Sequence, residues 1–352
     1  MDDSGGVDLA ALARGGLRII STAPVVLDHL RRLTGEHGLF EHALHDEPRR
    51  TLGYTVDDNA RALVVLCRYA RVVGESPDLQ PYLGMVVSGV VAGGWHNRMT
   101  PSGLWDDLRG SDDAHARAIW GLGEVLAAGM GDVDAVDSLR AGIVSFESTY
   151  PRPVSYAIFG GVAALEAGLL VDLIGDFLTS SSGRLPSPAS GDWIWPEPKL
   201  TYANARIPEA MIRVGEALGD GALVTRGLEV LAWLIDIETG SNGFSFTPVA
   251  GRGPAEMKPA FDQQPIEAWA MADACFAAGR VDGDEKWACG VVDAATWFLG
   301  RNDCGAVVYD ATTGAGFDGL RPTDVNRNRG AESTLSALGS LIRLRQVTMA
   351  SS

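Results

Sequence analysis

"GYTVDDNARAL", residues 53–63, puts two carboxylates, an amide and a guanidinium directly before an apolar run. That run, residues 62–67, is apolar on every face of a helix, and such a helix belongs in the interior of a protein. Its polar first turn then needs polar surroundings at one end of the buried helix. We therefore expect the turn at Asp57–Arg61 to face a shared cleft.

The pattern of a polar start and an apolar body recurs along the chain. Few windows alternate with period two, whereas many have helical periodicity and end at glycine. Buried helices are predicted at 57–73, 112–128, 155–168, 203–218, 263–278 and 331–345, with starts about 55 residues apart, as in stacked repeat units. Amphipathic helices are predicted between them at 22–33, 80–92, 133–147, 169–180, 221–237 and 284–299; Thr22 would cap the first, with Pro24 in its first turn.

The connecting loops are unequal in length. Most paths from a buried helix to the next amphipathic helix take a few residues, whereas the return paths are long: 34–56, 94–111, 181–202, 238–262 and 300–330. Long loops in compact domains are usually functional. If the buried helices run parallel, these loops gather at one end of an all-α (α/α)6 toroid with six inner and six outer helices. We expect one domain over 1–352, with 1–15 a flexible extension and 347–352 a flexible tail.

A repeated tripeptide supports this arrangement. Asn59-Ala60-Arg61, His115-Ala116-Arg117 and Asn204-Ala205-Arg206 occupy the same place in three predicted inner helices. The three tripeptides lie at similar distances from helix starts that were predicted without using them. This agreement favours a repeated position in the architecture over chance.

Composition excludes several classes of protein. The 45 acidic and 29 basic residues give a formal charge of −16, which repels nucleic acid and anionic membrane surfaces. No apolar window reaches the length of a membrane span, and the acidic opening MDDSGG is unlike a secretory signal, so we expect a cytoplasmic protein without membrane insertion. The four cysteines lack metal-ligand spacing. We expect no metal, cofactor or disulfide.

Two pairs of consecutive aspartates begin predicted inner helices. At the first pair, a helix cap and an Asp57–Arg61 ion pair would explain one carboxylate. Two consecutive side chains point in different directions, so the other carboxylate is free to face the cleft. In WDDLRGSDDAHARAIWGLG (residues 105–123), Asp113 begins the second helix. Trp105 offers an apolar face on which a sugar can stack, although a lone loop tryptophan is more often a hydrophobic plug.

The loop GDWIWPEPKLTYANARIPEAM, residues 191–211, combines tryptophans with a carboxylate between two prolines. The prolines hold the backbone extended. A carboxyl beside indole rings tends to have a raised pKa, which a general acid needs near neutral pH. We therefore predict Glu197 as the acid, the alternative being a solvated surface glutamate, with Trp195, Tyr202, Asn204 and Arg206 binding substrate.

The last two inner helices begin with further polar groups. FDQQPIEAWAM (residues 261–271) offers Gln263, Gln264 and Glu267, and paired amides suit sugar hydroxyls. A capping box is an equally good explanation of its aspartate. GFDGLRPTDVNRNRGAESTLSAL (residues 316–338) offers Asp318, Asn326 and Glu332, of which the glutamate can also be a simple partner of the helix dipole.

Two other chemistries fit less well. DDNAR is similar to the aspartate-rich cluster that holds magnesium in prenyl-diphosphate chemistry, but Arg61 stands where the last aspartate would be and would repel the metal. A sugar epimerase on a toroid would need two central histidines. Of the six histidines, only His115 lies at the start of an inner helix.

Four segments of the chain resemble sequences of the six-hairpin glycosidase-like superfamily: GYTVDDNARAL, WPEPKLTYANARIPEAM, FDQQPIEAWAM and GAESTLSAL. More narrowly, they resemble an incompletely characterised bacterial group found beside or fused to retaining glycosyltransferases. The resemblance covers the chain from about residue 30 and implies the toroid fold and carbohydrate chemistry. That group often has Phe-Glu-Asp after the tryptophan; here Pro196-Glu197-Pro198 lacks the aspartate, which puts a two-carboxylate role there in doubt.

Together these patterns predict a glycoside hydrolase acting on an oligosaccharide or glycoside. Glu197 would protonate the glycosidic oxygen, and Asp58 with Asp57 or Asp113 would supply the base, with Glu332 a further candidate. Sugar hydroxyls would be bound by Arg61, Arg117, Arg206, Asn204, Gln263, Gln264, Glu267, Asp318 and Asn326, and sugar rings by Trp105, Trp195 and Tyr202. The alternatives are a non-catalytic glycan-binding or glycosyltransferase-partner protein, a sugar phosphorylase and an epimerase.

Overall fold

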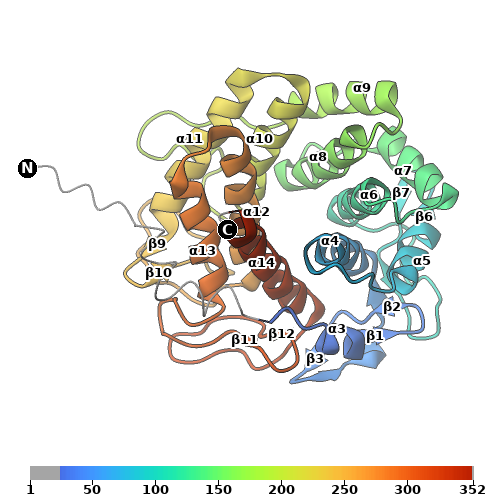
Figure 1. The fold of residues 1–352 in the computed structure, drawn as a ribbon, viewed down its shortest axis with the longest axis horizontal. Coiled ribbons are helices and arrows are strands. Elements are labelled where there is room, and N and C mark those ends of the chain that lie inside the picture. Colours follow the sequence, from blue (N-terminus) through green and yellow to red (C-terminus); the bar gives the residue numbers. More distant parts are fainter. Residues whose placement is uncertain (1–23, 351–352) are drawn as a thin grey trace, which may run out of the picture.

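The computed structural model describes residues 24–350, and within them twelve helices alternate between an inner and an outer ring (Figure 1). The inner helices are α4 (Val56–Val73), α6 (Asp112–Ala127), α8 (Pro151–Glu166), α10 (Arg206–Leu218), α12 (Pro265–Asp282) and α14 (Ala331–Ala350). The outer helices are α3 (Asp28–Leu33), α5 (Gln80–Ser88), α7 (Val133–Ser145), α9 (Val171–Ser182), α11 (Gly221–Glu238) and α13 (Glu285–Trp297).

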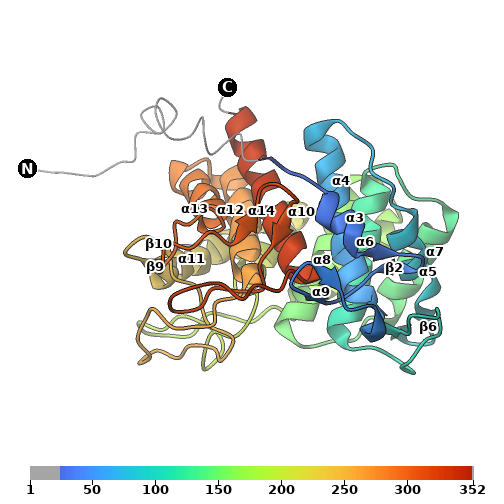
Figure 2. The same cartoon turned by 90° about the horizontal axis from the view of Figure 1, so that it is seen from below.

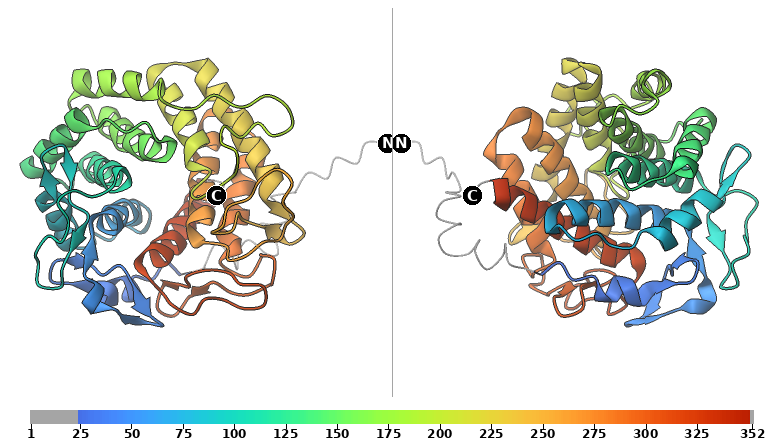
Figure 3. Two further views of the ribbon diagram at one scale, coloured as in Figure 1. Left: turned by 180° about the vertical axis from the view of Figure 1, so that it is seen from behind. Right: turned by 45° about the vertical axis from the view of Figure 1, so that its right-hand side comes forward.

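The inner helices close into a ring, because each packs against the next and α14 returns to α4. Figure 3 shows the same ring from behind. Viewed from the side, the long loops lie together at one end and α14 ends at the other (Figure 2). The predicted all-α (α/α)6 toroid is confirmed. No helix among residues 24–350 is long and apolar enough to cross a membrane.

The long loops carry short two-stranded antiparallel ladders and one turn of 3-10 helix. The ladders pair β1 (Thr34–Gly35) with β2 (Gly38–Leu39), β3 (Ala43–Leu44) with β4 (Glu47–Pro48), β5 (Tyr54–Thr55) with β8 (Arg98–Met99), β6 (Val90–Val91) with β7 (Gly94–Trp95), β9 (Thr239–Gly240) with β10 (Gly243–Phe244), and β11 (Tyr309–Asp310) with β12 (Ala315–Gly316). Of these, β5 and β8 join two different long loops just before α4.

Some helix bounds differ from the predictions. The first helix begins at Asp28, so Pro24 precedes it instead of lying in its first turn, and Thr22 and the predicted 1–15 extension lie outside the described residues. Helix α8 begins four residues earlier than predicted, with proline in its first turn. Helix α14 continues to Ala350, so residues 347–350 of the predicted tail are helical.

Two inner helices meet backbone to backbone. Added Cβ atoms would collide with the Gly160 carbonyl oxygen at Gly123 of α6, and with the Ile119 carbonyl oxygen at Gly160 of α8. Glycine alone allows helices to approach so closely. The Ala- and Gly-rich inner sequences therefore let six helices surround a narrow axis.

A buried carboxylate ties the ring together at this axis. Asp273 of α12 accepts hydrogen bonds from Arg68 Nη1 of α4 at 2.8 and 2.9 Å, Arg206 Nη1 at 2.6 Å and Arg343 Nε of α14 at 2.6 Å. Burial alone would raise the pKa of Asp273, but the three guanidinium groups hold it well below its usual range. The group is thus ionised, and its negative charge is matched by cations from three neighbouring inner helices.

Replacing Asp273 by Asn should therefore destabilise the fold by about 3 to 5 kcal/mol, because three buried guanidinium groups lose their shared counter-charge. Urea unfolding followed by circular dichroism measures this change. Asp28→Asn, which removes the exposed Asp28–Arg31 pair, is the matched control and should cost less than about 1 kcal/mol. Equal stability of the two variants would contradict the role given to Asp273.

Candidate active site

The first turns of the inner helices converge at the end where the long loops lie. Arg117 Nη1 of α6 donates to Asp57 Oδ2 of α4 at 3.1 Å, and Arg61 Nη1 of α4 donates to Glu332 of α14. The side chains of Asp57 and Glu332 are 20% and 39% exposed, so they reach solvent beside buried cations. The predicted convergence of these polar turns is therefore present.

Within the first turn of α4, Asp57 Oδ1 accepts from the backbone N–H of Asp58 at 2.9 Å, whereas Asp58 accepts from side chains. Thr55 precedes the helix, but its hydroxyl donates to Asp58 Oδ2 at 2.8 Å. Asp58 Oδ1 accepts from Arg61 Nη2 at 2.7 Å, whereas Asp57 turns toward Arg117 and lies 3.8 Å from Arg61. Consecutive aspartates thus occupy different environments, one buried and one partly exposed.

These environments shift the pKa values of the two carboxyl groups in opposite directions. Burial raises the pKa of Asp58 to about 7; Arg61 opposes this shift, and the charges of Asp57 and Glu332 add to it. Burial also acts on Asp57, but the guanidinium groups of Arg61 and Arg117 lower its pKa overall. Neighbouring carboxyl groups with pKa values pushed apart are typical of acid and base pairs in enzymes.

A second aspartate meets a tyrosine from the loop before α10. Tyr202 donates its hydroxyl to Asp113 Oδ2 at 2.5 Å, whereas Asp113 Oδ1 is buried without a hydrogen-bond partner. Burial and the Asp113 charge raise the pKa of Tyr202, so the phenol stays protonated as a donor. The Arg117 guanidinium lies 4.7 Å from the ring centre of Tyr156 and next to Asp57. The contacts of Arg117 and Tyr202 thus bring α4, α6, α8 and the loop together.

Glu197 is held by an arginine that the sequence analysis missed. Arg152 Nη1 of α8 donates to Glu197 Oε1 at 3.0 Å and lies 2.9 Å from Oε2. Glu197 therefore accepts a charge-assisted hydrogen bond in this structure, and the proton-donor role predicted for it stays a prediction. Arg152 stands in the first turn of α8 in the sequence YPRPVSY, whereas the helix was predicted to begin at residue 155.

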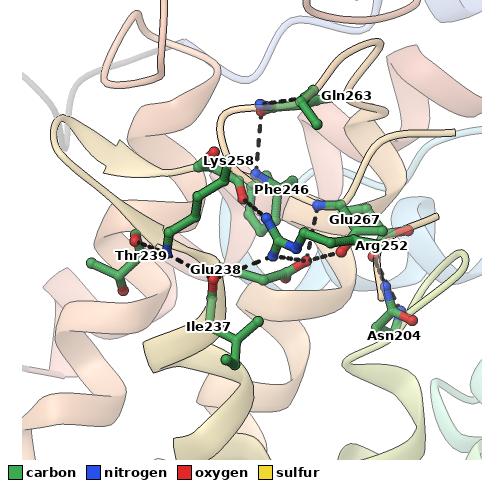
Figure 4. Close-up of polar contacts among 12 residues, drawn as sticks. Asn204, Ile237, Glu238, Thr239, Phe246, Arg252, Lys258, Gln263 and Glu267 are labelled. Carbon is green, nitrogen blue, oxygen red and sulfur yellow. Dashed lines mark hydrogen bonds and ion pairs between the residues drawn. The ribbon is translucent and has the colours of Figure 1, made fainter. Parts of the chain in front are cut away.

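Several predicted substrate ligands instead hold the loops in place. Glu267 accepts from Asn204 N and Nδ2, each at 3.1 Å, and from Ala203 N, while Gln263 accepts from Phe246 N at 3.2 Å (Figure 4). Burial and then the Glu238 charge raise the pKa of Glu267 to about 8, with the two backbone donors opposing. Asn204, Gln263 and Glu267 are all buried.

Two predicted aromatic or cationic ligands are sealed in the core. Trp195 is 1% exposed and its ring lies 6.4 Å from that of Trp233, so no face of it is open to a sugar. Arg206 is 0% exposed, and its guanidinium lies 4.9 Å from each of the rings of Trp120 and Trp269. Both side chains therefore contribute to packing in this structure.

The remaining predicted residues lie around the rim. Trp105 is half-buried and stacks on His96 with ring centres 4.9 Å apart. Asp318 accepts from Gly330 N at 2.7 Å, and the Asn326 side chain accepts from Asn328 N at 3.3 Å, so both order the 316–330 loop. Gln264 is half-buried at the start of α12.

The histidine at an inner helix start faces away from the axis. His115 Nε2 lies 3.0 Å from the Gly142 carbonyl oxygen of α7, and its ring packs beside Trp95 and Phe146. Burial lowers the pKa of His115 to about 4. A neutral histidine between inner and outer helices cannot serve as an axial acid or base.

A cavity of about 300 Å³ lies at the opposite end of the ring from these residues. Its lining includes one charged side chain from each inner helix: Arg71, Glu124, Glu166, Arg213, Arg280 and Arg343. Arginines there are paired with glutamates, as in Arg71–Glu124 at 3.5 Å, and also offset the negative ends of helix dipoles. None of the predicted site residues lines this cavity.

No cluster of three or more His, Cys, Asp or Glu residues with metal-binding geometry occurs in the described part of the chain. All four cysteines are unpaired, and burial raises the pKa of the Cys67 thiol to about 12. Cys67 therefore acts as a small apolar side chain.

No protein-family model and no curated protein sequence matches this chain. Solved structures match it over nearly its whole length. They include a cellobiose 2-epimerase from Bacillus thermoamylovorans (TM-score 0.71, 11% identity, 95% of this chain and 99% of that one) and a GH76 alpha-mannanase from Bacteroides thetaiotaomicron (0.65, 11%, 97% and 98%). A third is an inactive alpha-1,6-mannanase variant of Salegentibacter sp. in complex with alpha-1,6-mannotetrose (0.62, 10%, 94% and 98%). The chain thus shares the (α/α)6 toroid fold with these proteins.

Proposed function

We propose that this protein is a carbohydrate-active enzyme that hydrolyses a glycosidic bond with carboxyl groups as acid and base. The observation that carries the proposal is the network in which Arg117 of α6 holds Asp57 and Arg61 of α4 holds Glu332, while Tyr202 holds Asp113 and Arg152 holds Glu197. Carboxyl groups brought together from separate helices are the chemical requirement of glycoside hydrolysis.

In the proposed mechanism the consecutive pair on α4 supplies acid and base. Asp58, whose pKa is about 7, retains a proton near neutral pH and donates it to the glycosidic oxygen as the bond to the departing sugar breaks. Asp57, the ionised partner, takes a proton from the attacking water or attacks the sugar itself. This assignment moves the donor role from Glu197 to Asp58 because burial raises the pKa of Asp58; both carboxyl groups accept a hydrogen bond from an arginine.

The compared structures add support for a consecutive pair. The mannanase variant that is described as inactive carries alanine in place of two consecutive aspartates, and it is described in complex with alpha-1,6-mannotetrose. Of the consecutive aspartate pairs in this chain, two stand in the first turns of inner helices, at Asp57–Asp58 and at Asp112–Asp113. Of the second pair, only Asp113 contacts the other site residues, since Asp112 lies 3.8 Å from Arg109 outside the network.

Two other functions are separable by experiment. A non-catalytic glycan-binding protein, or a partner of a glycosyltransferase, is favoured by the fact that donors already engage Asp57, Asp58 and Glu197. It predicts binding without product. An epimerase is disfavoured because His115 faces an outer helix.

Purified protein should release reducing sugar from at least one member of a panel of oligosaccharides that includes alpha-1,6-mannans, without added phosphate. Strict dependence on phosphate would indicate a phosphorylase. Glycan-array binding without any released sugar would contradict hydrolysis and favour the binding role.

Replacing Asp57 or Asp58 by Asn should lower kcat/KM by about 100- to 10,000-fold, the range for removing a general acid or base. Circular dichroism melts confirm that the variants fold. The matched control is Asp112→Asn, which removes the carboxylate of the Asp112–Asp113 pair that lies outside the network and should leave activity unchanged. An active Asp58→Asn variant beside an inactive Glu197→Gln variant would return the donor role to Glu197.

The activity should also depend on pH in a predictable direction. We expect kcat/KM to fall above about pH 7, because Asp58 then loses the proton that it donates. Glu332→Gln removes a negative charge that raises the pKa of Asp58, so the fall should move to lower pH. A pH–rate profile with the same basic limb in both proteins would exclude Asp58 as the donor.

A further inference from the structure

Arg152 directs all its hydrogen bonds to one loop. It lies in the first turn of α8, and only 5% of it is exposed. Nη1 donates to Glu197, Nη2 donates to Asn204 Oδ1 at 3.0 Å, and Nε donates to the Tyr202 carbonyl oxygen. The guanidinium also lies 4.9 Å from the centre of the Tyr202 ring. One planar group thus fixes three residues of the 197–204 segment.

Two of these residues belong to the proposed site. The Tyr202 hydroxyl donates to Asp113, so its position determines how that aspartate is held. Within residues 24–350, no other side chain donates a hydrogen bond to the Glu197 carboxylate. The placement of both groups therefore depends on Arg152.

The same segment is held from its other side by α12. Glu267 accepts from Asn204 and from the Ala203 backbone N–H. Ala203 has φ of +46°, a left-handed conformation that is unfavourable for a non-glycine residue. A strained turn needs such surrounding contacts to persist. Glu267 fixes the turn, and Arg152 connects it to the site.

We infer that Arg152 is a positioning residue that orients the Glu197 carboxylate and aligns the Tyr202 hydroxyl on Asp113. This inference rests on the proposed function. The role requires the planar fork of arginine, because three acceptors at different angles are held by one rigid group. A lysine offers the charge on a flexible chain and cannot reproduce these angles.

The first test compares Arg152→Gln with Arg152→Lys. Both should lower kcat/KM by about 100-fold, mainly through kcat, because the site groups lose their alignment. Arg184→Gln is the matched control; Arg184 donates to the Ser148 carbonyl oxygen at 3.2 Å outside the network, so activity should be unchanged. Full activity of a folded Arg152→Lys variant would overturn the positioning role.

A double-mutant cycle separates positioning from a general loss of stability. If Arg152 acts through Tyr202, the Tyr202→Phe change should reduce kcat/KM in the natural protein but add little to Arg152→Gln. Melting temperatures of all four proteins show whether stability follows the same pattern. Fully additive losses in kcat/KM would contradict the inference.

A third measurement does not depend on catalysis. Lys199 is exposed within the held segment, so trypsin should cleave after it several-fold faster in Arg152→Gln than in the natural protein. Unchanged cleavage would overturn the inference whatever the activity. If cleavage is faster in Arg152→Gln but the natural protein hydrolyses no glycan, the contact between Arg152 and the loop is supported and the proposed hydrolase function is rejected.

Discussion

The structure depends on the carboxylate of Asp273 at the axis of the ring. It joins α12 to α4, α10 and α14 through Arg68, Arg206 and Arg343, so four inner helices share one ionic centre. A shared buried charge fixes how these helices are rotated as well as how far apart they lie. Their polar first turns consequently face one another at the end where the long loops lie, and Arg61 and Arg117 can link α14, α4 and α6.

Hydrophobic periodicity was sufficient to predict the toroid and most helix bounds, because a helix that is apolar on every face must lie in the interior. It also located the convergent carboxylates Asp57, Asp58 and Asp113. It failed for Trp195, which packs beside Trp233 of α11, and for Arg206, whose guanidinium lies beside the rings of Trp120 and Trp269. Sequence pattern shows which residue types are near a helix start, but it does not show which of them packing encloses.

Arg152 illustrates a second limit of sequence reasoning. Its sequence neighbours are prolines and apolar residues, so nothing local indicates that its contacts lie about fifty residues away, at Glu197, Tyr202 and Asn204. Conversely, Glu197 was chosen for its indole neighbours. In the structure its carboxylate instead contacts Arg152, which comes from another helix.

The contact of Gly123 with Gly160 restricts how this protein can change. At that crossing of α6 and α8, even one methyl group would strike a carbonyl oxygen, so the wall of the ring cannot accept larger side chains there. In the loop segments at 34–55 and 298–330 the same restriction holds at Gly53, Gly314 and Gly316, where an added Cβ would strike the carbonyl oxygens of Met99, Val26 and Ser333. Libraries intended to alter substrate preference should therefore vary other loop positions and keep these glycines and the held 197–204 segment fixed.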